Sequence, residues 1–153
     1  CPRPAWLMRR VLLRSFGARI AAGAHIFPSV RIAIPWNLDI GKDAAVGDRA
    51  ILYNLGKITI GASATVSQHA HLCAGTHDHR TASLPLVKAP IAIGEGAWVC
   101  ADAFVGPGVS VGAYAILGAR AVATKDVEDW TIAAGNPARP IGRREMSAEA
   151  SAS

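Results

Sequence analysis

Aliphatic residues recur every six positions along most of this chain. They stand at Ile34, Ile40, Val46, Leu52, Ile60, Val66, Leu72, Ile93, Val99, Val105, Val111, Leu117 and Ala123. Many of them are followed at once by glycine, and four positions after most of them the residue is small: Ala44, Ala50, Ala64, Ala70, Ala97, Ala103, Val109, Ala115 and Ala121. A period of six fits neither an amphipathic helix nor a simple alternating strand. Each hexad therefore predicts a short strand followed by a corner.

Three such hexads close one triangular coil, and successive coils then stack at about 4.8 Å, the usual spacing of hydrogen-bonded strands. In this arrangement the aliphatic residue points inward and the small residue fits where two walls converge. The glycine is expected to supply a backbone conformation that a Cβ atom would strain. The sequence thus predicts a parallel β-helix over residues 20–128.

The hexad count is broken at two places. Fourteen residues instead of twelve separate Val46 from Ile60, so residues 53–56 are expected to bulge from a corner. Twenty-one residues separate Leu72 from Ile93, so a loop of about residues 78–90 is expected to leave the lattice. Counting back one coil from the start of this loop leads to the bulge. Both irregularities are therefore predicted at one corner of the prism, which marks it as a candidate site.

The segment before the lattice has the pattern of an amphipathic helix from Pro4 to Phe16. Its apolar residues are Trp6, Leu7, Val11, Leu12, Leu13 and Phe16, and its polar stripe carries Arg9, Arg10 and Arg14. We expect this helical segment, residues 1–19, to pack against its own or a neighbouring prism. Attachment to an anionic bilayer surface is the second interpretation. Residues 129–146 are expected to form a C-terminal turn and extension, and the low-complexity residues 147–153 a disordered tail.

Composition and charge narrow the class of protein. Hydrophobic residues make up 51% of the chain and charged residues 18%, which excludes a disordered protein. The net charge of +5 comes from arginines near the two ends, without interleaved aromatic residues, so nucleic acid is not an expected partner. The longest charge-free run, residues 103–119, is too short and too rich in glycine to span a bilayer. Three cysteines without a CxxC pair favour reduced thiols and a cytoplasmic location.

Two further motifs accompany the hexads: the stretch from Leu72 to His79, and the ending that runs from Thr124-Lys125-Asp126 to Gly135-Asn136-Pro137-Ala138. With them, the chain resembles the left-handed β-helix hexapeptide acyltransferases over residues 6–144. It looks most like the O-acetyltransferases of colanic-acid and related exopolysaccharide synthesis, and more distantly like the maltose, galactoside and nodulation-factor acetyltransferases. The resemblance implies an all-β, left-handed parallel β-helix that forms a homotrimer with active sites between adjacent prisms. The left hand rests on the resemblance alone.

The resemblance also implies the site residues. A histidine at the position of His77 acts as general base on the acceptor hydroxyl, a task that suits the pKa of histidine. The acetyl donor is acetyl-CoA, and its implied contacts are Trp98, Ala101, Ala119, Thr124, Lys125 and Arg139. Lys125 and Arg139 suit phosphate groups, although both are also common as solvated surface charges.

The acceptor contacts are less well defined. The candidates are Tyr53, Asn54, Asp78 and His79, of which Tyr53 and Asn54 are expected to be structural lining just as readily. Whether Asp78 or His79 orients His77 is left open. The sequence does not name the acceptor.

These observations predict an acetyl-CoA-dependent O-acetyltransferase that acts on a saccharide or lipid-linked sugar. The alternatives are an N-acetyltransferase on an amino sugar, a metal-dependent hydratase of the γ-carbonic-anhydrase type, and a trimeric scaffold without chemistry. Five alternating residues could suggest a zinc site: His69, His71, Cys73, His77 and His79. They crowd into eleven residues, unlike the spaced ligands of that hydratase family, so no metal is expected. A peripheral contact with the inner face of the membrane remains an open alternative.

Overall fold

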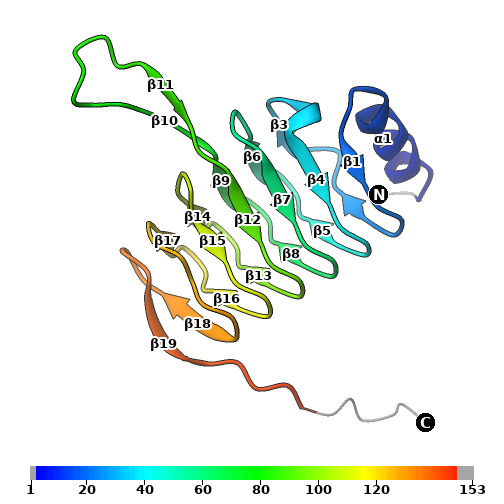
Figure 1. Ribbon diagram of the computed structural model, residues 1–153. Helices are drawn as coiled ribbons and strands as arrows, with labels where there is room; N and C mark the ends of the chain where they lie inside the picture. The colour runs from blue at the N-terminus through cyan, green and yellow to red at the C-terminus, as the bar shows by residue number, and fades with distance from the viewer. Residues whose placement is uncertain (1–2, 148–153) are drawn as a thin grey trace.

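The computed structural model describes residues 3–147, in which the chain winds into a three-sided parallel β-helix (Figure 1). Wall 1 contains β1 (Arg19–Ile20), β4 (Leu38–Ile40), β7 (Ile58–Ile60), β12 (Ile91–Ile93) and β15 (Ser110–Val111). Wall 2 contains β2 (His25–Ile26), β5 (Ala45–Val46), β8 (Thr65–Val66), β13 (Trp98–Val99), β16 (Ile116–Leu117) and β18 (Thr131–Ala134). Wall 3 contains β3 (Arg31–Ile32), β6 (Ile51–Tyr53), β9 (His71–Cys73), β14 (Phe104–Val105) and β17 (Val122–Ala123).

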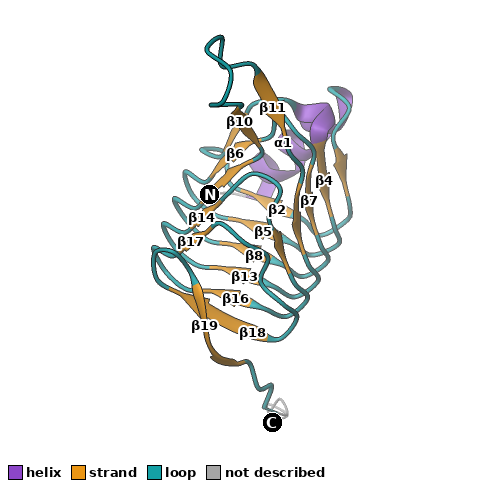
Figure 2. Ribbon diagram, turned by 60° about the vertical axis from the view of Figure 1, so that its left-hand side comes forward, coloured by secondary structure: helices purple, strands orange, loops and turns teal. Residues whose placement is uncertain are grey.

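The core consists of aliphatic residues stacked in register from coil to coil. In wall 2, for example, Val46 pairs with Val66, Val66 with Val99, and Val99 with Leu117. Apart from Ile34, every aliphatic position of the predicted series is buried, and so are all nine small residues at the corners. Figure 2 shows the strands of wall 2 lying as successive rungs. The predicted parallel β-helix is therefore confirmed.

The first coil differs from the prediction. The lattice begins at Ile20 and Ile26, and the third position of this coil is Ile32, which pairs with Leu52. Ile34, which the sequence placed in the series, instead precedes a short 3-10 helix, η1 (Pro35–Asn37). The spacing of six between Ile34 and Ile40 is accidental, because an eight-residue step joins Ile32 to Ile40 here.

The glycines that follow the aliphatic positions have a different role from the one expected. None of them has a positive φ; a Cβ atom on Gly61 would instead lie 2.6 Å from the backbone nitrogen of Glu95 on the next coil. The left-handed conformation falls two residues later, at Asp43, Ser63 or Tyr114 for example. These glycines are therefore required by the close approach of stacked corners and not by their own φ.

The excursions from the lattice all leave the corner between wall 3 and wall 1. Residues 33–37, residues 54–57 and the segment after β9 stand on three successive coils at this corner. The longest is a hairpin of β10 (Gly75–His77) and β11 (Leu86–Lys88), which pair antiparallel and project away from the prism (Figure 1). The shared corner is confirmed. The predicted irregular loop starts earlier and is a hairpin, because Gly75 to His77 already pair with its return arm.

The N-terminal helix, α1 (Arg3–Ser15), agrees with the predicted Pro4–Phe16 and packs across the first coil of its own prism. The arginines lie on the inner side: Arg9 donates to the carbonyl oxygens of Pro28 and Val30, and Arg14 donates to that of Ile20. Trp6 and Leu13 also face the prism, with the Trp6 ring 4.7 Å from that of His25. The helix therefore packs with its predicted polar stripe facing the prism.

The lattice continues past its predicted end at residue 128, because β18 pairs in parallel with β16. The last strand, β19 (Arg139–Arg143), then runs antiparallel to β18 and closes this end. Of the predicted tail, residues 148–153 lie outside the described residues. No helix within residues 3–147 is long and apolar enough to cross a membrane.

Candidate functional site

His77 ends the outgoing arm of the hairpin, where it is exposed and paired with Leu86. Its Nδ1 atom lies 2.6 Å from the carbonyl oxygen of Leu84 on the return side. A carbonyl oxygen can only accept a hydrogen bond, so this contact requires the proton on Nδ1 and leaves the lone pair on Nε2. The imidazole is thus held in the tautomer that a general base needs.

Asp78 shapes the turn of the hairpin. Its carboxylate accepts hydrogen bonds from the Arg80 backbone N–H at 3.0 Å and the Thr81 hydroxyl at 3.3 Å, and its own N–H donates to Pro85. No hydrogen bond joins its carboxylate to His77 among the described residues, and the group that contacts the imidazole is the Leu84 carbonyl. The contact that orients His77 is therefore a backbone carbonyl. The sequence could not indicate this contact, because every residue type has a backbone carbonyl. His79 is exposed farther along the hairpin.

A cavity of about 580 Å³ opens at the C-terminal end, between the turn after β17 and the final pair β18–β19. Lys125, Arg139 and Arg143 bring three cationic side chains to its lining, alongside Asp126 and Glu128. Asp126 is already engaged, because its carboxylate accepts the backbone N–H of Ser110 at 2.8 Å. The predicted pair Lys125 and Arg139 is thus brought together by the fold, and Arg143 is added to it. These cations suit the phosphate groups of an anionic ligand.

The other predicted donor contacts lie outside this cavity. Trp98 projects from wall 2 with 44% of its area exposed, and its indole N–H donates to the Ser67 hydroxyl at 2.9 Å. Ala101 and Ala119 occupy the same corner on successive coils, where the Arg120 N–H bonds the Ala101 carbonyl. Thr124 is exposed directly after β17. None of these four is among the residues that line the cavity.

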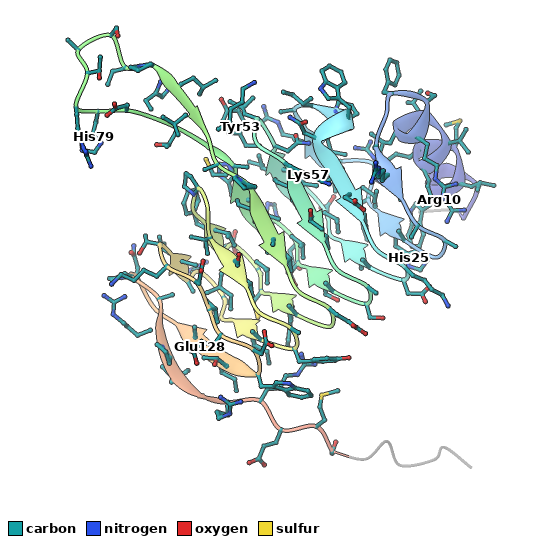
Figure 3. All side chains as sticks on the ribbon, viewed as in Figure 1. Arg10, His25, Tyr53, Lys57, His79 and Glu128 are labelled. Carbon is teal, nitrogen blue, oxygen red and sulfur yellow. The ribbon has the colours of Figure 1, made fainter. Side chains whose placement is uncertain are left out.

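A second pocket of about 470 Å³ lies on the outer side of wall 3. Its polar groups come from Arg31, Tyr53, His71 and Cys73, and the remainder of its lining is aliphatic. Tyr53 is 40% exposed and stands at the base of the hairpin (Figure 3). Arg31 was not among the site residues predicted from the sequence. Starting the hexads at Ile32 would have stacked Arg31 below Ile51 and His71.

Asn54, the second predicted acceptor contact at this corner, is fully buried. Its Oδ1 accepts the backbone N–H groups of Ala33 and Ile34 at 3.0 and 2.9 Å, and its Nδ2 donates to the Ile34 carbonyl. Since the amide is committed to the backbone of the coil below, the structure favours the structural role over acceptor binding. Asn54 ties together two of the excursions at the corner.

His71 lies half-buried on β9, with its ring 5.2 Å from that of Phe104 in an edge-to-face arrangement. Its Nε2 atom is buried without a hydrogen-bond partner. Burial lowers the pKa of His71 below its ordinary value, and the charge of Arg31 lowers this pKa further. The five residues considered for zinc do not converge: within residues 3–147 no group of three such side chains could hold a metal ion.

The hairpin and the C-terminal cavity are separated within one chain. Figure 3 shows His79 on the projecting hairpin and Glu128, which lines the cavity, beside the last coil. The fold therefore brings Lys125 and Arg139 together but does not bring His77 to them.

Comparisons with known proteins place this geometry in context. A scan against models of protein families finds no match. The chain is 43% identical over 143 residues to the protein provisionally designated colanic acid biosynthesis acetyltransferase WcaF of Escherichia coli K12, covering 94% of this chain and 79% of that protein. It is 25% identical over 136 residues to the galactoside O-acetyltransferase of the same organism, covering 87% of this chain and 67% of that protein.

Solved structures show the same fold. A maltose O-acetyltransferase from Clostridium difficile superposes with a TM-score of 0.84 at 24% identity, covering 95% of this chain and 80% of that one. A hexapeptide-repeat acetyltransferase from Vibrio cholerae, solved with acetyl coenzyme A, superposes with a TM-score of 0.85 at 21% identity, covering 92% and 78%.

Proposed function

The chain belongs to the hexapeptide-repeat acetyltransferases, and we propose that it transfers the acetyl group of acetyl-CoA to a hydroxyl of a saccharide, free or lipid-linked. Its relative in colanic acid biosynthesis and its galactoside O-acetyltransferase relative support a sugar acceptor. The observation that carries the proposal is the His77 side chain, which is exposed on the hairpin and fixed with Nε2 free.

In the proposed reaction, Nε2 of His77 removes the proton of the acceptor hydroxyl while the hydroxyl oxygen attacks the thioester carbonyl carbon. The tetrahedral intermediate then collapses, the carbon–sulfur bond breaks, and the imidazolium returns the proton to the departing thiolate. Backbone N–H groups at a corner of the lattice are suited to stabilise the oxyanion. No covalent enzyme intermediate is needed, because both substrates bind together.

The cations of the C-terminal cavity support binding of the acetyl donor, because coenzyme A carries several phosphate charges. Lys125 supplies a compact charge and Arg139 a planar fork, and Arg143 belongs to the same proposed phosphate site. By their match to the family, Trp98, Ala101, Ala119 and Thr124 are the further proposed donor contacts. The acceptor is proposed to bind against the wall 3 pocket, with Tyr53 as its contact at the base of the hairpin and with Asp78 and His79 as further contacts on the hairpin itself.

The active molecule is proposed to be a homotrimer. Wall 1 presents mainly small or polar side chains outward, whereas walls 2 and 3 present Trp98, Ile116, Ile51 and Phe104. These larger faces suit contact between prisms. A neighbouring copy would also complete the site, since His77 is separated from the cationic cavity of its own chain (Figure 3).

The test is the release of free thiol from acetyl-CoA across a panel of sugars, sugar phosphates and amino sugars. His77→Ala is expected to lower the rate by about 10²- to 10⁴-fold, while the oligomeric state measured by light scattering stays unchanged. Arg80→Ala, on the same hairpin, is the matched control and should retain most of the activity, because only the backbone N–H of Arg80 bonds Asp78. Equal rates for wild type and His77→Ala would reject the base, and transfer only to amines would reject O-acetylation.

A further inference from the structure

The outward side of α1 is apolar from Leu7 to Leu12. Its large side chains are more than half exposed, ranging from 55% to 72%: Leu7, Met8, Val11, Leu12 and, directly after the helix, Phe16. Trp36 is 66% exposed and stands beside the end of the helix, where its Cβ packs against Gly17. We call these six residues the α1 patch. Contiguous exposed apolar surface of this kind marks an interaction site.

The orientation of α1 is fixed by specific contacts. Arg9 binds two carbonyl oxygens of the first coil, and Arg14 binds a third. Leu13 is buried on the same inner side. Rotating the helix to bury the α1 patch would break these hydrogen bonds, so the native packing presents an apolar face to the outside.

The charged residues of α1 and of the first coil all have the same sign. The first acidic residue of the sequence is Asp39, whereas six arginines precede it: Arg3, Arg9, Arg10, Arg14, Arg19 and Arg31. Figure 3 shows Arg10 at the helix. The helix and the first coil therefore carry only positive charge, and acidic side chains begin on the next coil with Asp39, Asp43 and Asp48. This favours an anionic partner and opposes docking of a second identical patch, which would carry the same charge.

We propose that the α1 patch docks on the surface of an anionic lipid bilayer, with α1 lying in the plane of the interface. The apolar side chains would enter the boundary between headgroups and acyl chains, and Arg10 and Arg19, which bind none of the three carbonyl oxygens, would attract anionic headgroups. Trp36 at the margin suits the interfacial position that tryptophan prefers. This attachment is peripheral and does not depend on the chemistry at His77.

The test is co-sedimentation of the full chain with vesicles of phosphatidylcholine, alone or mixed with phosphatidylglycerol. Binding is expected to the mixed vesicles, to be weaker on pure phosphatidylcholine, and to fall as salt is raised. Val11→Glu with Leu12→Glu should lower the partition coefficient at least about tenfold, because two charges replace inserted apolar groups. The matched control is Ile141→Glu with Met146→Glu. These two residues are 69% and 59% exposed at the opposite end of the prism, and the control should bind vesicles as the wild type does.

Circular dichroism and light scattering on the same variants separate docking from folding and assembly. The proposal is overturned if wild type does not bind mixed vesicles, or if the patch variant binds them as well as wild type. It is also overturned if wild type does not bind vesicles and light scattering shows a smaller oligomer for the patch variant. The α1 patch would then be a contact between copies of the chain. The vesicle experiment needs neither a metal nor acetyl-CoA. Its result is therefore independent of whether the proposed acetyl transfer is correct.

Discussion

The Nδ1 atom of His77 lies 2.6 Å from the carbonyl oxygen of Leu84, across the hairpin that leaves the prism. The backbone of Leu84 adopts a left-handed conformation with φ of 48°, which is unfavourable for a residue with a branched side chain. The turn holds this conformation through hydrogen bonds that begin at Asp78. The tautomer of His77 is therefore set by the shape of the hairpin and not by an acidic side chain.

Removing the Asp78 carboxylate should loosen this turn and misplace the imidazole. We expect Asp78→Ala to lower kcat by about 10- to 100-fold while the KM for acetyl-CoA stays the same. Asp78→Asn should recover much of kcat, because its side-chain oxygen still accepts the Arg80 N–H. Steady-state kinetics of the three proteins provide the measurement. An equal loss in both variants would point to a role for the charge itself.

Lys125 and Arg139 should act through the phosphates of the donor. Replacing either by alanine is expected to raise the KM for acetyl-CoA about tenfold, the usual effect of losing a charge-assisted hydrogen bond. Acetyl-pantetheine, which lacks the nucleotide and its phosphates, is the control substrate, and its kcat/KM should not change in these variants. A parallel loss with both donors would contradict phosphate binding and indicate a general distortion of the cavity.

Asn54→Ala should destabilise the fold rather than impair acceptor binding specifically. It leaves the Ile34 N–H without a partner and the Ala33 N–H with only its 3.3 Å bond to the Leu52 carbonyl, which should lower the free energy of unfolding by about 2 kcal/mol. Tyr53→Ala, at the exposed neighbouring position, should change stability little and raise the KM of the acceptor. Urea unfolding measures the stability of each variant, and steady-state kinetics measure its KM for the acceptor. A stable Asn54→Ala protein would contradict the assigned role.

A methyl group on Gly61 should be costly because stacked corners are so close. Its Cβ would lie 2.6 Å from a backbone nitrogen of the next coil, and we expect Gly61→Ala to lower stability by about 2 kcal/mol or more. Gly142 has nothing within 4 Å of the equivalent position, so Gly142→Ala is the matched control and should be close to neutral. Thermal unfolding of both variants measures the loss of stability. Similar losses in Gly61→Ala and Gly142→Ala would contradict the packing explanation.

His71 should make stability depend on pH. Burial, followed by the charge of Arg31, lowers its pKa in the folded state below the ordinary 6.5. Above 6.5 the imidazole is neutral in both states. As the pH falls below 6.5, the unfolded chain takes up a proton more readily than the folded one, so the free energy of unfolding decreases.

The measurement is urea unfolding from pH 7.5 down to about pH 5. His71→Gln should flatten the decrease relative to wild type. His69→Asn, which removes an exposed histidine at a left-handed turn position that asparagine tolerates, should preserve it. Equal slopes in wild type and His71→Gln would show that other groups control the acid sensitivity.

The sequence alone determined the lattice, because each coil repeats the same local packing. An inward aliphatic residue, a glycine and a small corner residue recur together, so Val46, Val66 and Val99 could be aligned without coordinates. The same count located the corner from which the hairpin leaves. It failed at the first coil, where the eight-residue step from Ile32 to Ile40 imitates a hexad at Ile34, and at the last, where β18 continues the lattice past residue 128.

The tertiary structure decided what depends on contacts between distant backbone groups. The burial of Asn54 follows from the path of the coil beneath it, and the fixed imidazole of His77 follows from a carbonyl seven residues away. The outward apolar face of α1 follows from where its arginines find carbonyl oxygens. Hexad spacing records which residues point into the prism, whereas hydrogen bonds to the main chain leave no mark on residue type, and so only the folded chain reveals them.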